Sequence, residues 1–313
     1  MRLVTRSDFD GLICAVVLKL AGKIDSIQFV HPKDLQDGKF AVTADDVLTN
    51  VPYVPGCGLW FDHHATEIER VVGKIPFMGD CRLAPSAARV VYDYFGGKNR
   101  FPGFEDMMTA VDKADSAQFT GDEILNPAGW NLLSFVTDAR TGLGRFRDYR
   151  ISNYQLMYDL IDACRRMTID QILALPDVQE RVTRYFEHDV LFRKMVTERS
   201  HTVGDVIISD LRGVETIYCG NRFLVYAMHP KQNCSIWIVN GRENRNVSFA
   251  LGHSIVNRTC TVDIGALVRQ FGGGGHRVAG TCQVDHAEAE KTLHALIEGM
   301  RGDDRERHVA NAA

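Results

Sequence analysis

The chain has 313 residues, of which 45% are hydrophobic, and a formal net charge of −4 at pH 7. This length and composition predict a globular protein with a sizeable core and about two domains. The charge excludes a chromatin-style binder, because the protein has no overall basic field that would attract a polyanion. Any attraction for a phosphate-rich molecule must therefore come from local basic patches or from bound cations.

Eight cysteines are scattered along the sequence without a Cys-x-x-Cys pair. Structural zinc sites built on cysteine use close paired spacings, so none is expected, and the thiols are expected to be reduced in a cytoplasmic protein. The first strand pattern begins within three residues of Met1, and no apolar run is long enough to cross a bilayer. We therefore expect neither a signal peptide nor a membrane partner.

The amino-terminal part alternates between strand and helix patterns. A strand-like run at residues 3–5 precedes an acidic turn, after which apolar residues recur with helical period in residues 12–20. Further strands are expected at 26–30, 46–50 and 58–61, and helices at 86–95 and 105–113. This alternation predicts a doubly wound α/β domain at residues 1–130, with a mostly parallel sheet and a ligand site at the carboxyl ends of its strands.

The remainder of the chain predicts a helical connector and a second domain. Residues 131–200 form the connector, in which Pro176 is tolerated near the start of the second helix. Strands are then expected at 206–211, 223–227, 235–239 and 247–251, and helices at 264–271 and 287–300. This order predicts a smaller α+β domain at residues 201–302. The polar residues 303–313 are expected to form a flexible tail.

The turn after the first strand carries Asp8 and Asp10, followed by Gly11, which permits an unusual turn. Carboxylates two residues apart in extended backbone point the same way and repel each other unless a cation lies between them. A phosphate loop offers glycine amides and a lysine at this place, whereas carboxylates would reject a phosphate that has no metal bridge. The turn therefore indicates a divalent cation site, with helix capping by aspartate as the alternative.

A second cluster, Asp62-His63-His64, closes the apolar run at residues 58–61. One carboxylate and two imidazoles at a strand end are suitable metal ligands. Because the carboxyl ends of parallel strands meet at one edge of a sheet, the two clusters predict one shared site. The alternative is an exposed polar loop after the strand.

These clusters resemble the motifs of the DHH phosphoesterases, a family named for the triplet seen here as Asp62-His63-His64. The other segments that resemble family motifs are, in chain order, Arg6-x-Asp8-x-Asp10-Gly11, Val47-Leu48-Thr49-Asn50, Ala114-Asp115-Ser116, and Phe271-Gly272-Gly273-Gly274-Gly275-His276 with Ala279-Gly280. The last of these resembles the glycine-rich signature of the DHH-associated C-terminal domain. The order and spacing of the motifs make the resemblance specific over most of the chain.

The resemblance implies a site for one or two Mn²⁺ or Mg²⁺ ions. Its ligands would be Asp8, Asp10 and His63, and Asp115 would complete the set. Asp112 is an alternative to Asp115, because residues three apart share a helix face. Such a site would serve the in-line attack of a water molecule on phosphorus.

The resemblance also implies catalytic roles for the other two residues of the triplet. His64 would contact the phosphoryl oxygen or the leaving group, and Asp62 would orient the histidines. Two positions depart from the family pattern, because Arg6 replaces a histidine and Asn50 replaces a bridging aspartate. Arginine cannot bind a metal, and asparagine offers only a weak neutral oxygen.

Two hypotheses follow from these departures. In the first, a single cation is bound by Asp10, His63 and Asp115, while the fixed charge of Arg6 replaces the missing ion and binds a substrate phosphate. In the second, catalysis has been lost and the protein is a nucleotide or phosphate sensor.

Two further segments are candidates for substrate binding. The four glycines at 272–275 are expected to form a loop, either a flexible connector or a phosphate cradle. The residues assigned to this cradle are Gly273, Gly274, Gly275, His276, Arg277 and Arg258, with His253 as a further candidate. Four arginines, Arg140, Arg145, Arg147 and Arg150, form either a solvated face or a positive wall for a substrate with several phosphates.

The expected function is that of a metal-dependent hydrolase of the exopolyphosphatase-like kind, which cleaves a terminal phosphate ester or anhydride. Inorganic polyphosphate, a short single-stranded oligonucleotide and a nucleotide bisphosphate are all candidate substrates, because each has a terminal phosphoryl group flanked by negative charge. Apolar residues 190–192 of the connector suggest a homodimer.

Overall fold

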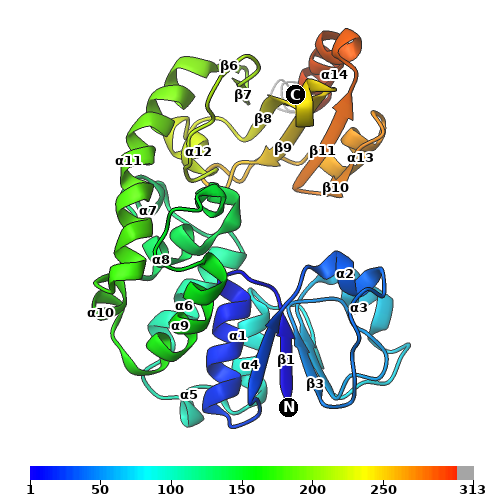
Figure 1. Ribbon diagram of the computed structural model, residues 1–313. Coiled ribbons are helices and arrows are strands. Elements are labelled where there is room, and N and C mark those ends of the chain that lie inside the picture. The colour runs from blue at the N-terminus through cyan, green and yellow to red at the C-terminus, as the bar shows by residue number, and fades with distance from the viewer. Residues whose placement is uncertain (302–313) are drawn as a thin grey trace, which may run out of the picture. The chain divides into compact units, whose positions relative to one another are not determined.

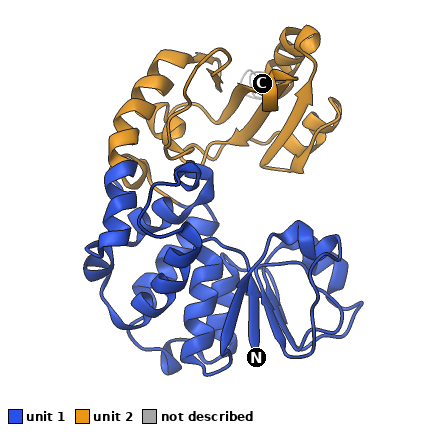
Figure 2. Cartoon of the chain, viewed as in Figure 1, with its two compact units in different colours: residues 1–118, 127–185 blue, residues 119–126, 186–313 orange. Residues whose placement is uncertain are grey.

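The computed structural model describes residues 1–301, which form two compact units. Unit 1 comprises residues 1–118 and 127–185, and unit 2 comprises residues 119–126 and the described residues from 186 onward (Figure 2). The predicted tail at 303–313 lies outside the described residues. Which segments fold independently stays a prediction.

A five-stranded sheet forms the centre of unit 1, in the order β2-β1-β3-β4-β5. Its strands are β1 (Arg2–Thr5), β2 (Ser26–Phe29), β3 (Asp46–Thr49), β4 (Leu59–Asp62) and β5 (Gly79–Cys81). Every neighbouring pair is parallel, which confirms the predicted doubly wound sheet. The strand order reverses between β1 and β3, and ligands of such sheets bind beyond the carboxyl ends of the strands at this switch point.

Helices cover both faces of this sheet. The helices of unit 1 are α1 (Phe9–Leu20), α2 (Pro32–Gln36), α3 (Ala65–Val71), α4 (Ala87–Tyr94), α5 (Gly97–Arg100), α6 (Glu105–Asp115), α8 (Gly129–Thr137), α9 (Asn153–Arg166) and α10 (Ile169–Leu173), and several of them pack on other helices. Helices α2 and α3 lie on one side of β1 and β3, and α1 and α4 lie on the other (Figure 1). On the first side, Leu35 and Val71 pack against Leu48 and Trp60 of the sheet. Coverage of both faces explains why all four residues of β3 are buried.

Unit 2 contains a six-stranded mixed sheet in the order β10-β11-β9-β8-β7-β6. Its strands are β6 (Ser200–Val203), β7 (Val206–Asp210), β8 (Cys234–Asn240), β9 (Val247–His253), β10 (Gly274–His276) and β11 (Ala279–Val284). Its helices are α7 (Gly121–Leu125), α12 (Leu224–Met228), α13 (Ile264–Arg269) and α14 (Ala289–Arg301), and α11 (Pro176–Arg199) contributes its later residues. The core of this α+β unit joins Ile236 and Phe249 of the sheet to Leu267 of α13 and Leu296 of α14.

The predicted strand at residues 223–227 is wrong, because Leu224–Met228 form helix α12. An unbroken apolar run does not distinguish a strand from a buried helical turn. Leu224, Val225 and Tyr226 are all buried, and α12 packs against α7. Tertiary burial on several sides therefore decided the conformation.

The predicted loop at residues 272–275 is correct only in its first half, because Gly274–His276 form strand β10. This strand pairs antiparallel with β11. A Cβ atom on Gly273 would lie 2.2 Å from the carbonyl oxygen of Thr281, and one on Gly275 would lie 2.4 Å from that of Ala279. Glycine is thus required at both positions by the close approach of two backbone segments.

No helix among residues 1–301 is long and apolar enough to span a membrane.

An ion pair joins the first residues of β1 and β3. Arg2 Nε lies 2.7 Å from Asp46 Oδ1 and Arg2 Nη2 lies 2.8 Å from Asp46 Oδ2, and the Thr43 amide donates to the same carboxylate at 2.7 Å. Burial opposes ionisation of Asp46, but the hydrogen bonds from Arg2 and Thr43 prevail and lower its pKa below the ordinary value. The ionised carboxylate therefore stabilises the folded state.

We predict that Asp46→Asn lowers the free energy of unfolding at pH 7 by about 2 kcal/mol, because a buried acceptor of several charged and neutral donors is lost. Folding lowers the pKa of Asp46, so the ionised carboxylate stabilises the native protein most at neutral pH. The difference in free energy of unfolding between the native protein and the variant should therefore be largest at neutral pH and should decrease below about pH 4. Urea unfolding between these pH values measures it. Asp45→Asn, at an exposed neighbour, is the control. A difference independent of pH would contradict the prediction.

Candidate metal centre

The carboxylate of Asp10 is buried between the first turns of two helices. Asp10 lies in the first turn of α1 and is 2% exposed. Its Oδ1 accepts a hydrogen bond from the Ala88 amide at 2.7 Å, and its Oδ2 accepts one from the Ala87 amide at 3.0 Å. These amides begin α4, so the partial positive charge of a helix N-terminus faces the carboxylate.

His63 follows β4 and is held by a main-chain carbonyl. Its Nδ1 lies 3.1 Å from the carbonyl oxygen of Ala84, to which it donates a hydrogen bond as the N–H tautomer. The Nε2 atom is the ring nitrogen that faces the carboxylates, and it lies 3.0 Å from Asp115 Oδ2 and 3.9 Å from Asp10 Oδ2. The Nε2 atom is buried. A ligand nitrogen oriented by a carbonyl is the usual arrangement in metal sites.

The charges of this cluster are not balanced by the protein. Burial and the nearby charge of Asp115 raise the pKa of Asp10 well above its ordinary value. Burial alone would lower the pKa of His63, but the carboxylates of Asp115 and Asp10 raise it to about 9. Two like charges about 4 Å apart repel by roughly 4 kcal/mol at an effective dielectric constant near 20. A helix N-terminus returns at most about 2 kcal/mol, and a divalent cation would offset the remaining repulsion.

The donor set fits a divalent cation. One ligand atom from each of Asp10, His63 and Asp115 lies within 4.8 Å of the other two. Two carboxylate oxygens and one imidazole nitrogen suit Mn²⁺, and Mg²⁺ is compatible with the oxygens. Among residues 1–301, Asp62, His63 and His64 form the one other such group.

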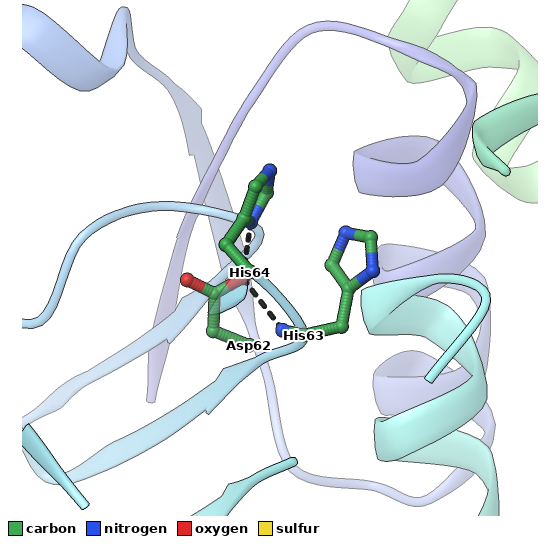
Figure 3. Close-up of side chains that lie close together, drawn as sticks. All are labelled: Asp62, His63 and His64. Carbon is green, nitrogen blue, oxygen red and sulfur yellow. Dashed lines mark hydrogen bonds and ion pairs between the residues drawn. The ribbon is translucent and has the colours of Figure 1, made fainter. Parts of the chain in front are cut away.

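This second group is held together by hydrogen bonds instead. Asp62 is fully buried, and its Oδ1 accepts hydrogen bonds from His64 Nδ1 at 2.7 Å and from the His63 amide at 2.8 Å (Figure 3). The imidazole of His64 is 42% exposed. Asp62 thus orients the ring of His64 and leaves its Nε2 as the nitrogen available to a substrate. The ring of His63 is oriented by Ala84, so Asp62 contacts only the main chain of that residue.

Asp8 is surrounded by protein donors. Its Oδ1 accepts from the Gly11 amide at 2.9 Å and from Asn50 Nδ2 at 3.0 Å, and its Oδ2 lies 3.1 Å from Arg6 Nε. Asp8 is therefore the N-cap of α1, as the capping alternative predicts. The two residues that depart from the family motifs, Arg6 and Asn50, both bind this carboxylate. Its predicted role as a metal ligand stays a prediction.

The geometry distinguishes the two candidate aspartates of α6. Asp115 lies beside His63, whereas Asp112 accepts hydrogen bonds from Ser86 Oγ at 2.7 Å and from Arg89 Nη2 at 2.6 Å. Ser86 also caps α4 through the amide of Arg89 at 3.0 Å. Asp112 therefore supports the helix whose N-terminus binds Asp10.

Three of the four arginines of the predicted wall, Arg140, Arg145 and Arg150, have different surroundings. Arg140 lies in a 3₁₀ turn, η1 (Ala139–Thr141), where it bonds Asp138 at 2.8 Å and interacts electrostatically with Asp8 and Asp115. Arg150 instead pairs with Asp177 at 2.9 Å. The guanidinium of Arg145 lies 5.4 Å from the ring centroid of Phe146. Of these, Arg140 is the one whose charge acts on the cluster.

The residues assigned to the phosphate cradle lie in unit 2, whereas the metal cluster lies in unit 1. His276 and Arg277 are exposed at the end of β10, where Arg277 Nη2 donates to the Thr261 carbonyl at 3.2 Å. Arg258 donates to the Ile255 carbonyl at 3.0 Å. Binding of phosphate by these residues stays a prediction.

The main-chain groups that hold the site have no sequence signal. The Ala84 carbonyl and the Ala87 and Ala88 amides belong to residues whose side chains carry no polar atom. The sequence does mark the start of α4, because Ser86 is a typical N-cap residue. These contacts became visible only when β4, β5 and α4 were placed in space.

The fold agrees with that of a solved structure. The chain is similar to the pGpG-specific phosphodiesterase PggH from Vibrio cholerae, with 50% sequence identity and a TM-score of 0.88 over 96% of this chain and 99% of that one. The chain belongs to the DHH phosphoesterase family. This DHH protein is therefore a hydrolase that cleaves phosphoester bonds.

Two more distant structures also match. An exopolyphosphatase-related protein from Bacteroides fragilis has 12% identity and a TM-score of 0.49, over 96% of this chain and 91% of that one. RecJ from Thermus thermophilus, in complex with Mn²⁺, has 12% identity and a TM-score of 0.46, over 94% of this chain and 51% of that one. No protein-family model and no curated protein sequence matches the chain.

We predict opposite effects for Asp115→Asn and Asp112→Asn. The first should weaken Mn²⁺ binding at least tenfold without destabilising the metal-free protein, because it removes a charge that repels Asp10. The second should change the dissociation constant for Mn²⁺ by no more than a few-fold from that of the native protein. It should lower the free energy of unfolding by about 2 kcal/mol, because Arg89 loses its charged partner. Calorimetric titration and unfolding in a chelator measure the two quantities. Loss of Mn²⁺ binding in the Asp112 variant alone would contradict the assignment.

Proposed function

We propose that this DHH protein is a metal-dependent phosphodiesterase whose substrate is a short linear dinucleotide such as pGpG. The observation that carries the proposal is the 50% identity to the pGpG-specific enzyme PggH over nearly the full length of both chains. Hydrolysis of the internal phosphodiester bond of pGpG gives two mononucleotides. This substrate belongs to the short-oligonucleotide class among the three classes expected from the sequence.

We further propose that one cation is bound, by Asp10, His63 and Asp115. The support is the state of Asp8, whose two oxygens already face Arg6, Asn50 and the helix amide. A second cation near Asp8 would have to displace the guanidinium of Arg6 or approach it at close range. When bound, the cation supplies a Lewis acid for the phosphoryl oxygen and a water molecule of lowered pKa.

The protein side chains then have separate tasks. Arg6 binds Asp8 through Nε, and its half-exposed guanidinium keeps its Nη groups for a substrate phosphate. Arg140 adds a second positive charge on the same side, because it acts on both Asp8 and Asp115. His64, whose Nδ1 is bound by Asp62, has Nε2 in position to contact the phosphoryl or leaving oxygen.

These assignments predict the metal content. The purified protein should bind one Mn²⁺ per chain tightly, as measured by elemental analysis after gel filtration. The double variant Arg6→His with Asn50→Asp should bind two, because it provides an imidazole and a carboxylate where Asp8 now meets a cation and an amide. Two tightly bound ions in the native protein would contradict the single-cation proposal.

The substrate is tested with a panel. With Mn²⁺, pGpG should be hydrolysed with a higher kcat/KM than inorganic polyphosphate, a longer oligoribonucleotide or adenosine bisphosphate. His63→Ala should lower kcat/KM at least about a hundredfold, because a metal ligand is lost. His201→Ala, at an exposed histidine of β6, is the matched control.

Each other result has a distinct meaning. Equal residual activity in the native protein and the His63 variant would indicate a contaminating nuclease and would reject the enzyme assay. Binding of pGpG without turnover would support the sensor alternative. A preference for polyphosphate would reject the proposed substrate while leaving the metal site intact.

A further inference from the structure

Unit 2 contains a cluster of two thiols and an imidazole that the phosphodiester chemistry does not use. Cys234 begins β8 and lies opposite His253, the last residue of β9, in the sheet register. Cys260, in the segment after β9, packs against the core cluster that contains Cys234. The register pair and this packing bring the two thiols and the imidazole to the same end of the sheet.

The surroundings of His253 favour charge separation with Cys260. His253 Nε2 lies 2.8 Å from the Val262 carbonyl, to which it donates, so its other ring nitrogen is left for the thiol. The hydrogen bond from Cys234, followed by that from His253, lowers the pKa of Cys260 to about 5 against the effect of burial. Cys260 in turn raises the pKa of His253, although the charge of Arg277 opposes this. These interactions favour the thiolate form of Cys260 and the imidazolium form of His253.

Access and pKa together separate Cys260 from the other cysteines. Six of the eight thiols are buried, and only Cys57 and Cys260 are half-buried. Cys260 follows the exposed residues Arg258 and Thr259. Burial raises the pKa of Cys57 to about 11, so the two accessible thiols differ strongly in their thiolate content at neutral pH. Thiolate character and exposure together determine which cysteine is oxidised.

We propose that Cys260 is an oxidation site for hydroperoxides and that Cys234 is its resolving thiol. The Cys260 thiolate attacks the terminal peroxide oxygen, so that an S–O bond forms, the O–O bond breaks, and an alkoxide or hydroxide leaves and is protonated. The Cys234 sulfur, after losing its proton, then attacks the Cys260 sulfur. An S–S bond forms and the S–O bond breaks, with release of water. The two thiols are thus oxidised by two electrons and the peroxide is reduced.

The site lies beside the hairpin of β10 and β11. The Arg277 guanidinium donates to the Thr261 carbonyl at 3.2 Å, and the Ile264 amide donates to the Arg277 carbonyl at 2.9 Å. The His253 amide donates to the Val278 carbonyl at 2.9 Å. The segment that carries Cys260 is therefore hydrogen-bonded at both ends to the turn of this hairpin.

The first experiment uses the native protein and compares two thiols in one molecule. Brief treatment with iodoacetamide at pH 7, followed by peptide mass spectrometry, should alkylate Cys260 roughly tenfold faster than Cys57, or more, after the lower intrinsic nucleophilicity of the more acidic thiol is included. Cys57 is the matched control, because it is also half-buried. Equal rates at the two cysteines, or a faster rate at Cys57, would overturn the proposal.

The second experiment follows oxidation by hydrogen peroxide. The native protein should form a Cys234–Cys260 disulfide, recognised as a cross-linked peptide that a reductant separates. Cys234→Ser should instead accumulate a sulfenic acid at Cys260 that dimedone traps, and Cys260→Ser should form neither product. His253→Gln should slow the reaction of Cys260 while leaving that of Cys57 unchanged. A sulfenic acid that persists in the native protein, with no disulfide, would overturn the role of Cys234.

Discussion

The candidate site depends on the burial of one carboxylate, that of Asp10. An ionised carboxylate loses much of its hydration free energy when it is buried, and the protein compensates only in part, through the first amides of α4. Asp115 then adds a second negative charge within reach of the same imidazole. The balance of these terms leaves the cluster short of positive charge, which is the physical condition for binding a cation.

A second carboxylate near the cluster, that of Asp8, interacts with protein groups instead. Asp8 lies two residues before Asp10, yet its carboxylate is balanced by the guanidinium of Arg6 and the amide of Asn50. A fixed cation built into the chain cannot dissociate and has no open coordination position, whereas a bound metal ion can accept a water or a phosphoryl oxygen. The carboxylate of Asp8 thus has a fixed positive partner in the protein, whereas that of Asp10 lies in the cluster that could hold a metal ion.

Much of the architecture followed from local patterns in the sequence. Alternating strand and helix patterns gave the parallel sheet, and the polar residues after β1 and β4 marked its carboxyl edge, because parallel strands end together. The run at residues 223–227 gave the wrong element, since an apolar run carries no periodic information once all sides are buried. The glycines after α13 were misread in part for a related reason: a strand packed closely on its neighbour needs glycine as much as a turn does.

By itself, the sequence determined the candidate ligand types, their place near the ends of strands and the two departures at Arg6 and Asn50. These are properties of residue identity and spacing. Only the tertiary structure decided that Asp115 and not Asp112 faces His63, that Ala84 orients His63, and that Arg6 and Asn50 both bind Asp8. The physical reason is that these choices depend on directions and on main-chain groups. Every residue carries the same amide and carbonyl, so the chain must be folded before a particular one can be assigned to a particular side chain.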